Sequence, residues 1–243
     1  MKNEKFIKKI MWAMAVLLIV SVIVGGCALK KESTDEKETS SETEESQNSS
    51  SESIVTSSIT KNNTKSKVEV VDGISYVDGV MIVNKSYSLP ASYNPGCSDE
   101  ADEAYYKMKA AAKEDDVELF VVSDFRSYET QESIYNRYVS EDGKAAADRY
   151  SARPGHSEHQ TGLAYDLNSL SSSFGETTEG KWLANHCWEY GFIIRYPKGK
   201  ESVTGYMYEP WHVRYLGEKT AKAVQESGLT LEEYLGIDSV YSD

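Results

Sequence analysis

Residues Ser151–Ser169 read SARPGHSEHQTGLAYDLNS and carry two of the chain's four histidines, followed by Asp166. Residues 162–167 have the pattern of a short strand that enters a core. Alternate side chains of a strand point to opposite faces, so Asp166 would lie on the face away from Tyr165 and Leu167. A carboxylate at such a position needs a partner, which could be a metal ion, an arginine or a set of backbone amides. The stretch is therefore either a loop that feeds a core strand or half of a metal site.

Strand and helix patterns alternate on both sides of this stretch. Asp-Gly turns separate short strands within residues 68–90, and the apolar run Val117–Phe125 has the pattern of a core strand. We expect further strands within 162–167, 191–196 and 205–217, and helices within 98–115, 127–141, 143–150, 175–191, 218–228 and 229–236. Mixed elements of this kind predict a single small α+β domain over residues 67–243, with a mainly antiparallel sheet flanked by helices.

A second polar cluster, YEPWH, spans Tyr208–His212. A spacing of three does not place Glu209 and His212 on one face of an ideal strand. Pro210 cannot donate to a strand ladder, so it favours an edge or a bend, and a bend could turn both side chains into one cleft. A hydrolytic zinc site needs three protein ligands, an open position for water and a carboxylate that removes the proton from that water. The alternative is an apolar Trp211 in the core beside an exposed or hydrogen-bonded histidine.

Arg126 follows the predicted strand Val117–Phe125 and lies next to Asp124. An arginine at a strand exit can form a surface ion pair with such a neighbour. It can also direct its guanidinium at a substrate carboxylate, or at the oxyanion that develops when water attacks a carbonyl.

Taken together, these clusters resemble the zinc D-Ala-D-Ala carboxypeptidase family that includes VanY, the LdcB-type L,D-carboxypeptidases and the dipeptidase VanX. The family pattern Ser-x-His-x-x-Gly-x-Ala-x-Asp is met by Ser157, His159, Gly162, Ala164 and Asp166. The family element Glu-x-Trp-His is met by Glu209, Trp211 and His212. The resemblance extends from about residue 81 to about residue 217, with no departure at the ligand positions.

The resemblance implies a Zn²⁺ ion in a cleft on the sheet, held by His159, Asp166 and His212. Glu209 would be the general base, and Arg126 would stabilise the transition state and orient the peptide. Two further positions, Ser157 and Gln131, resemble those that hydrogen-bond the terminal carboxylate or the stem peptide. His156 lies outside the ligand pattern.

The implied function is removal of the C-terminal D-alanine from peptidoglycan stem peptides, as a D-alanyl-D-alanine carboxypeptidase. Two alternatives remain. The first is an L,D-carboxypeptidase that acts on tetrapeptide stems with the same metal chemistry. The second, of a different class, is a non-catalytic lipoprotein that binds the cell wall. A purely structural zinc is disfavoured because structural sites usually have four Cys or His ligands.

The N-terminus has the layout of a bacterial export signal. A basic cluster at residues 2–9 precedes the apolar run at residues 10–26, which ends in Val-Gly-Gly before Cys27. We expect a lipoprotein signal peptide over residues 1–26 and a lipid on Cys27; the alternative is an uncleaved membrane helix. Residues 27–66 are rich in Ser, Thr and Glu, which predicts a disordered tether. Both alternatives place the domain outside the cytoplasm, and the first anchors it to the outer face of the bacterial membrane.

The net charge of −13 argues against nucleic acid as a partner, because a polyanion would be repelled. We expect a monomer that binds the stem peptide. Apart from Cys27, the chain has Cys97 and Cys187. An extracellular setting permits a disulfide between them, and two free thiols are the alternative.

Overall fold

The computed structural model describes residues 67–242. The predicted signal peptide, Cys27 and the whole of the predicted tether lie outside this range. Within it, no helix is both long enough and apolar enough to cross a membrane. The two remaining cysteines are free thiols, since Cys97 is exposed and Cys187 is buried.

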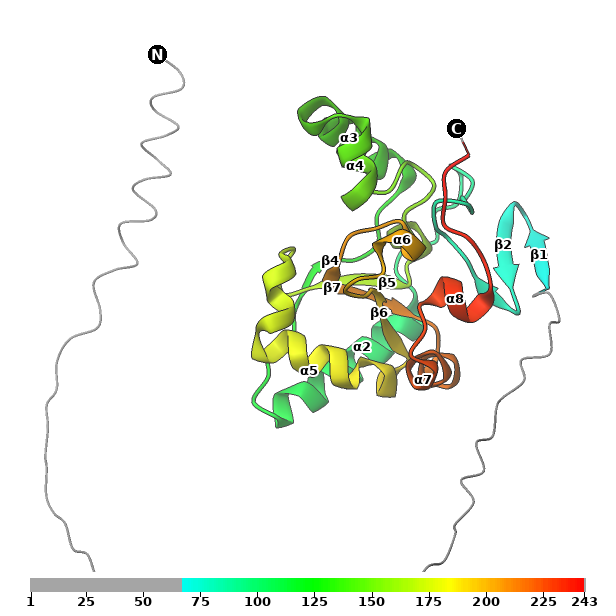
Figure 1. The fold of residues 1–243 in the computed structure, drawn as a ribbon. Helices are drawn as coiled ribbons and strands as arrows, with labels where there is room; N and C mark the ends of the chain where they lie inside the picture. Colours follow the sequence, from blue (N-terminus) through cyan, green and yellow to red (C-terminus); the bar gives the residue numbers. More distant parts are fainter. Residues whose placement is uncertain (1–66, 243) are drawn as a thin grey trace, which may run out of the picture. The chain divides into compact units, whose positions relative to one another are not determined.

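A small antiparallel sheet begins the described chain, formed by β1 (Val68–Val71), β2 (Ile74–Val77) and β3 (Val80–Met81) (Figure 1). The predicted Asp-Gly turns connect these strands, and each turn has both of its residues at positive φ. That geometry suits tight hairpin turns, in which Asp-Gly is favoured. The turns thus confirm the prediction of short strands at this end of the domain.

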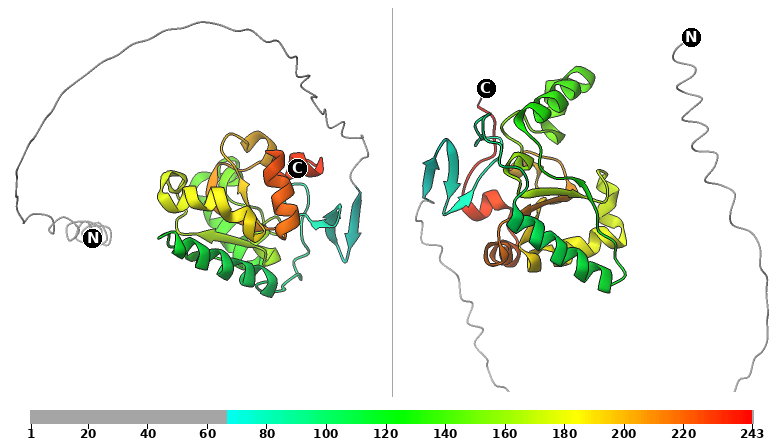
Figure 2. Two further views of the ribbon diagram at one scale, coloured as in Figure 1. Left: turned by 90° about the horizontal axis from the view of Figure 1, so that it is seen from below. Right: turned by 180° about the vertical axis from the view of Figure 1, so that it is seen from behind.

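The main sheet has the strand order β4-β5-β7-β6, and all its pairings are antiparallel. Its strands are β4 (Val121–Ser123), β5 (Ala164–Leu167), β6 (Phe192–Tyr196) and β7 (Glu209–Tyr215). One face packs against helices α2 (Asp99–Glu114) and α5 (Thr178–His186), which lie on the same side of the sheet (Figure 2). Buried side chains of the sheet, such as Tyr165, Leu167 and Val213, meet Met108 and Leu183 of the helices in the main core.

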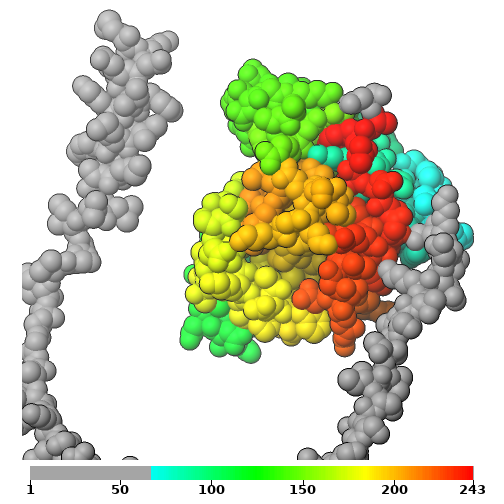
Figure 3. Space-filling model, in the orientation of Figure 1, coloured from blue at the N-terminus to red at the C-terminus, as the bar shows by residue number. Residues whose placement is uncertain are grey.

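The remaining helices are α3 (Tyr128–Asp142), α4 (Lys144–Tyr150), α6 (Glu201–Thr204), α7 (Glu218–Ser227) and α8 (Leu231–Leu235), with short 3₁₀ turns at Glu158–Thr161, Ser172–Glu176 and Cys187–Tyr190. Helices α3 and α4 form a lobe that stands away from the rest of the domain in the space-filling view (Figure 3). Helices α7 and α8 pack on Ile193 of β6 in a second core. The expected α+β class, with an antiparallel sheet flanked by helices, is confirmed.

Pro210 lies inside a strand of the sheet. Of the two predicted alternatives, the sheet edge is wrong, because β7 includes Pro210 and lies between β5 and β6. The other alternative, a bend, corresponds to an irregularity in the strand pairing. The pairing of β6 with β7 shifts at this point, from Ile194 opposite Val213 to Tyr196 opposite Glu209. Three residues of β7 therefore oppose one residue of β6, and such a bulge tolerates a proline that lacks an N–H.

Candidate metal centre and substrate cleft

His159, Asp166 and His212 converge on the face of the sheet that lies opposite the main core. Each offers one ligand atom, and these atoms all lie within 4.8 Å of one another. Asp166 Oδ2 is 3.2 Å from His159 Nε2, and Asp166 Oδ1 is 3.1 Å from His212 Nδ1. All three side chains are buried. Two imidazoles and one carboxylate form the donor set of a catalytic zinc site with one open position, so these residues fit that metal.

The strand pairing explains why two of these side chains meet. Asp166 of β5 is paired directly with His212 of β7, so both project from the same face. The neighbours Tyr165 and Val213 form the next pair, and both enter the core. The alternation expected from the sequence thus places Asp166 where it was predicted.

His159 reaches the same point from the 3₁₀ turn Glu158–Thr161. Its Nδ1 lies 2.7 Å from the carbonyl oxygen of Asp124, which leaves Nε2 directed at Asp166. The turn ends at Gly162, whose φ is 71°. A Cβ at this glycine would lie 2.1 Å from the carbonyl oxygen of Gly96, so the connection to β5 requires glycine.

Glu209 lies beside the three candidate ligands. Its carboxylate is 3.9 Å from His212 Nδ1, because the bulge in β7 brings residues three apart to one cleft. Burial, the largest effect, raises the pKa of Glu209 to about 8, and the nearby Asp166 acts in the same direction. A buried carboxylate with a raised pKa near the operating pH is suited to general acid and base chemistry.

The two histidines differ in their protonation. Burial lowers the pKa of His159, which keeps its ring neutral. Burial alone would also lower the pKa of His212, but its hydrogen bonds with the carboxylates of Asp166 and Glu158 raise it to about 9. A metal ion would have to displace a proton from His212 at neutral pH, since metal ligation needs a neutral imidazole.

Arg126 lies at the edge of the centre, with Nη2 3.7 Å from Asp166 Oδ2. Its guanidinium donates to Gln131 Oε1 and to Ser123 Oγ, each at 2.8 Å. Gln131 is 1% exposed, and its amide nitrogen donates to the carbonyl oxygen of Ala152 at 2.6 Å. The structure thus brings Gln131 to Arg126, where it holds the guanidinium in place.

A cleft of about 670 Å³ opens onto this centre. Ser157, Arg126 and Glu209 line it together with the three candidate ligands. Its lining also includes Arg137 and Tyr138 of α3, together with Tyr196 and Tyr206, none of which the sequence patterns indicated. Two residues of the same stretch lie outside the cleft: His156 Nδ1 donates to the carbonyl oxygen of Asn84 at 2.8 Å, and Tyr165 faces the core, as predicted.

Glu158 is the buried residue that the sequence reasoning passed over, although it lies between Ser157 and His159. Its carboxylate contacts His212, Arg195 and Arg214. The sequence did contain a relevant pattern, because FIIRY and HVRY each place an arginine inside an apolar strand. A buried arginine needs an anionic partner, so these strands indicate a buried carboxylate elsewhere in the chain.

Comparisons with known proteins identify the family of the chain. The VanY family model, described as D-alanyl-D-alanine carboxypeptidase, matches residues 95–218. The chain is 38% identical over 259 residues to YodJ of Bacillus subtilis (strain 168), covering 92% of this chain and 95% of that protein.

Two solved structures are similar throughout the domain. The L,D-carboxypeptidase DacB from Streptococcus pneumoniae is 44% identical with a TM-score of 0.66, covering 73% of this chain and 99% of that one. A mutant of the D,D-pentapeptidase VanY from the VanB-type vancomycin resistance cassette, in complex with Zn(II), is 35% identical with a TM-score of 0.56, covering 63% and 97%. With a family model spanning the whole centre and a relative that aligns along nearly the full chain, the protein belongs to the VanY family of D-alanyl-D-alanine carboxypeptidases.

Proposed function

We propose that this carboxypeptidase uses zinc to remove the C-terminal D-alanine from peptidoglycan stem peptides. The observation that carries the proposal is the convergence of His159, Asp166 and His212 within 4.8 Å, with the Glu209 carboxylate beside them. Zinc at this position would polarise the scissile carbonyl and lower the pKa of a bound water to about 7. The match to a VanY structure in complex with Zn(II) supports this metal.

The chain's own groups would perform the proton transfers. Glu209 takes the proton of the attacking water and passes it to the leaving amine of D-alanine. Arg126 lies within the cleft and is held by Ser123 and Gln131, so its guanidinium is fixed where it can stabilise an oxyanion or bind a terminal carboxylate. Ser157, which also lines the cleft, offers a hydroxyl to the same carboxylate.

A second candidate is L,D-carboxypeptidase activity on tetrapeptide stems. It is favoured by the higher identity to the L,D-carboxypeptidase DacB, 44% against 35% for the D,D-pentapeptidase VanY. Both reactions would use the same metal ligands and the same base. They differ in the residue that precedes the released D-alanine, so the cleft lining away from the metal ligands would discriminate between them.

Muropeptides that end in tri-, tetra- and pentapeptides separate these activities. Release of one D-alanine from the pentapeptide, measured by mass spectrometry, is expected for the D,D enzyme. Loss of D-alanine from the tetrapeptide alone would contradict that assignment and establish the L,D one. No hydrolysis of either, by protein that has bound zinc, would favour the non-catalytic wall-binding alternative.

We also propose that the domain is held outside the cytoplasm by a lipid on Cys27, after removal of residues 1–26, and that residues 27–66 act as a tether. The basic and apolar segments before Val24-Gly25-Gly26-Cys27 support this arrangement. Replacing Cys27 with serine should release the protein from the membrane fraction. Membrane retention of that variant would instead favour an uncleaved helix.

A further inference from the structure

A buried carboxylate that the proposed chemistry does not use contacts His212 of the metal centre. Glu158 is 1% exposed, and its Oε2 is 3.3 Å from Nε2 of His212. This nitrogen is on the far side of the ring from Nδ1, the atom that faces Asp166. The His212 ring therefore lies between two carboxylates.

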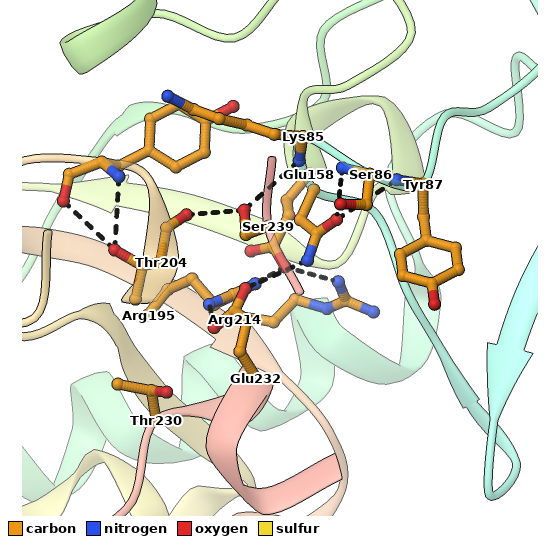
Figure 4. Close-up of polar contacts among 12 residues, drawn as sticks. Lys85, Ser86, Tyr87, Glu158, Arg195, Thr204, Arg214, Thr230, Glu232 and Ser239 are labelled. Atoms are coloured by element: carbon orange, nitrogen blue, oxygen red, sulfur yellow. Dashed lines mark hydrogen bonds and ion pairs between the residues drawn. The ribbon is translucent and has the colours of Figure 1, made fainter. Parts of the chain in front are cut away.

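Two buried arginines hold Glu158 in this place. Its Oε1 accepts hydrogen bonds from Arg195 Nε at 2.8 Å and from Arg214 Nη1 at 2.9 Å (Figure 4). Both donors are guanidiniums, which stay charged, so Glu158 pairs with them as an ionised carboxylate. An ionised carboxylate can only accept hydrogen bonds.

The arginines are themselves fixed by groups outside the metal centre. Arg195 forms a two-pronged ion pair with Glu232 of α8, at 2.8 and 2.5 Å, and Arg214 donates to the carbonyl oxygen of Met81 at 2.8 Å. Two cations and two anions balance within this network, which is the condition for burying such charges. Glu158 cannot swing away from His212 without leaving both arginines short of a partner.

This geometry restricts the protonation of His212. Because Glu158 can only accept, the neutral ring must carry its hydrogen on Nε2 and present the lone pair of Nδ1 toward Asp166 and His159. Carboxylates in this position orient metal-binding histidines and raise their basicity. We propose that Glu158 is a positioning residue, which holds His212 in the orientation and tautomer that bind the metal through Nδ1. The inference rests on the proposed zinc site and deepens it.

The test compares two glutamates of one network in the full chain. Zinc affinity, measured by competition with a chromophoric chelator, should fall about 10- to 100-fold in Glu158→Gln. Glu232→Gln removes the same charge from the same network without touching His212, so it serves as the matched control. We expect it to lower the melting temperature while its zinc affinity stays within about threefold of the unmutated protein. Unchanged zinc affinity in Glu158→Gln, or an equal loss in Glu232→Gln, would overturn the positioning role.

A second measurement needs no variant and so does not depend on the folding of Glu158→Gln. In ¹⁵N-histidine NMR spectra of the zinc-loaded chain, His212 should show a slowly exchanging proton on Nε2 and metal-shifted Nδ1. The reverse pattern would overturn the inference. Neither measurement uses a peptide, so failure of the loaded protein to hydrolyse muropeptides would contradict the proposed function and leave this inference standing.

Discussion

Asp166 and His212 occupy directly paired positions on the neighbouring antiparallel strands β5 and β7, with Asp166 Oδ1 3.1 Å from His212 Nδ1. Two of the three candidate ligands are therefore held by the ladder of a sheet whose opposite face is core. Sites built on strands are more rigid than sites on loops. The third ligand, His159, comes from a turn that Gly162 joins to the same strand.

Metal removal should consequently lower stability without unfolding the domain. The sheet ladder and a turn joined to it hold the three side chains, so the far-ultraviolet circular dichroism spectrum should be retained after chelation. At a zinc concentration about 1,000 times the dissociation constant, binding adds about 4 kcal/mol. Thermal melts should therefore show a higher melting temperature with zinc than without it. The variant His186→Ala, which removes a histidine paired with Glu189 away from the cleft, should keep the full shift.

Replacing Glu209 with glutamine should abolish most hydrolysis while zinc remains bound. The amide is similar in size to the carboxylate but cannot take a proton from water, and general base catalysis contributes about 10²- to 10⁴-fold. The value of kcat/KM on the best muropeptide should fall by that factor. Metal analysis of the same sample should show unchanged zinc content. Glu189→Gln, an exposed change elsewhere in the domain, should leave kcat/KM unaltered.

The local patterns of the sequence predicted a large part of the fold. The Asp-Gly turns and the alternation around Asp166 each act over a few residues, so they can be predicted without tertiary information. The strand predicted over Val117–Phe125 is shorter in the structure, where β4 spans Val121–Ser123, because only these residues pair with β5.

Features that depend on distant residues could not be predicted in this way. The bulge at Pro210 exists because of how β6 pairs with β7, and the local pattern left an edge and a bend as equal alternatives. The partners of Glu158 lie 37 and 56 residues away, in Arg195 and Arg214. The hydrogen bond that Gln131 accepts from Arg126 depends on where α3 packs, so the sequence could not predict it.

Gly162→Ala should destabilise the domain and weaken metal binding together. An alanine would adopt a strained φ, and its Cβ would meet the carbonyl oxygen of Gly96 at 2.1 Å, so the backbone must move. We expect a loss of about 1 to 3 kcal/mol or more in urea unfolding. Gly228→Ala is the matched control, since it has a φ of 66° but no atom within 4 Å of its Cβ. Equal losses in the two variants would contradict the steric role of Gly162.

Asp148→Asn should lower the stability of the domain in a pH-dependent manner. Asp148 Oδ1 accepts from the Tyr135 hydroxyl at 2.7 Å, and Oδ2 accepts from Arg153 Nη2 at 2.8 Å. Partial burial alone would raise the pKa of Asp148, but these hydrogen bonds hold it below its ordinary value. Losing the charge should cost about 1.5 to 3 kcal/mol at pH 7, measured by urea unfolding.

The sign of the pH effect follows from the lowered pKa. A carboxyl group whose pKa is depressed by folding contributes stability above its unfolded pKa of about 3.9, and that contribution disappears as the pH falls through the folded pKa. The free energy of unfolding of Asp148→Asn should therefore differ most from that of the unmutated protein at pH 7, and the difference should shrink below about pH 4. The exposed change Glu141→Gln on α3 should cost little at either pH, since surface substitutions are usually within about 0.5 kcal/mol. A difference that stays constant down to pH 3 would show that Asp148 acts through packing, because protonation of the unmutated carboxyl would then be without effect.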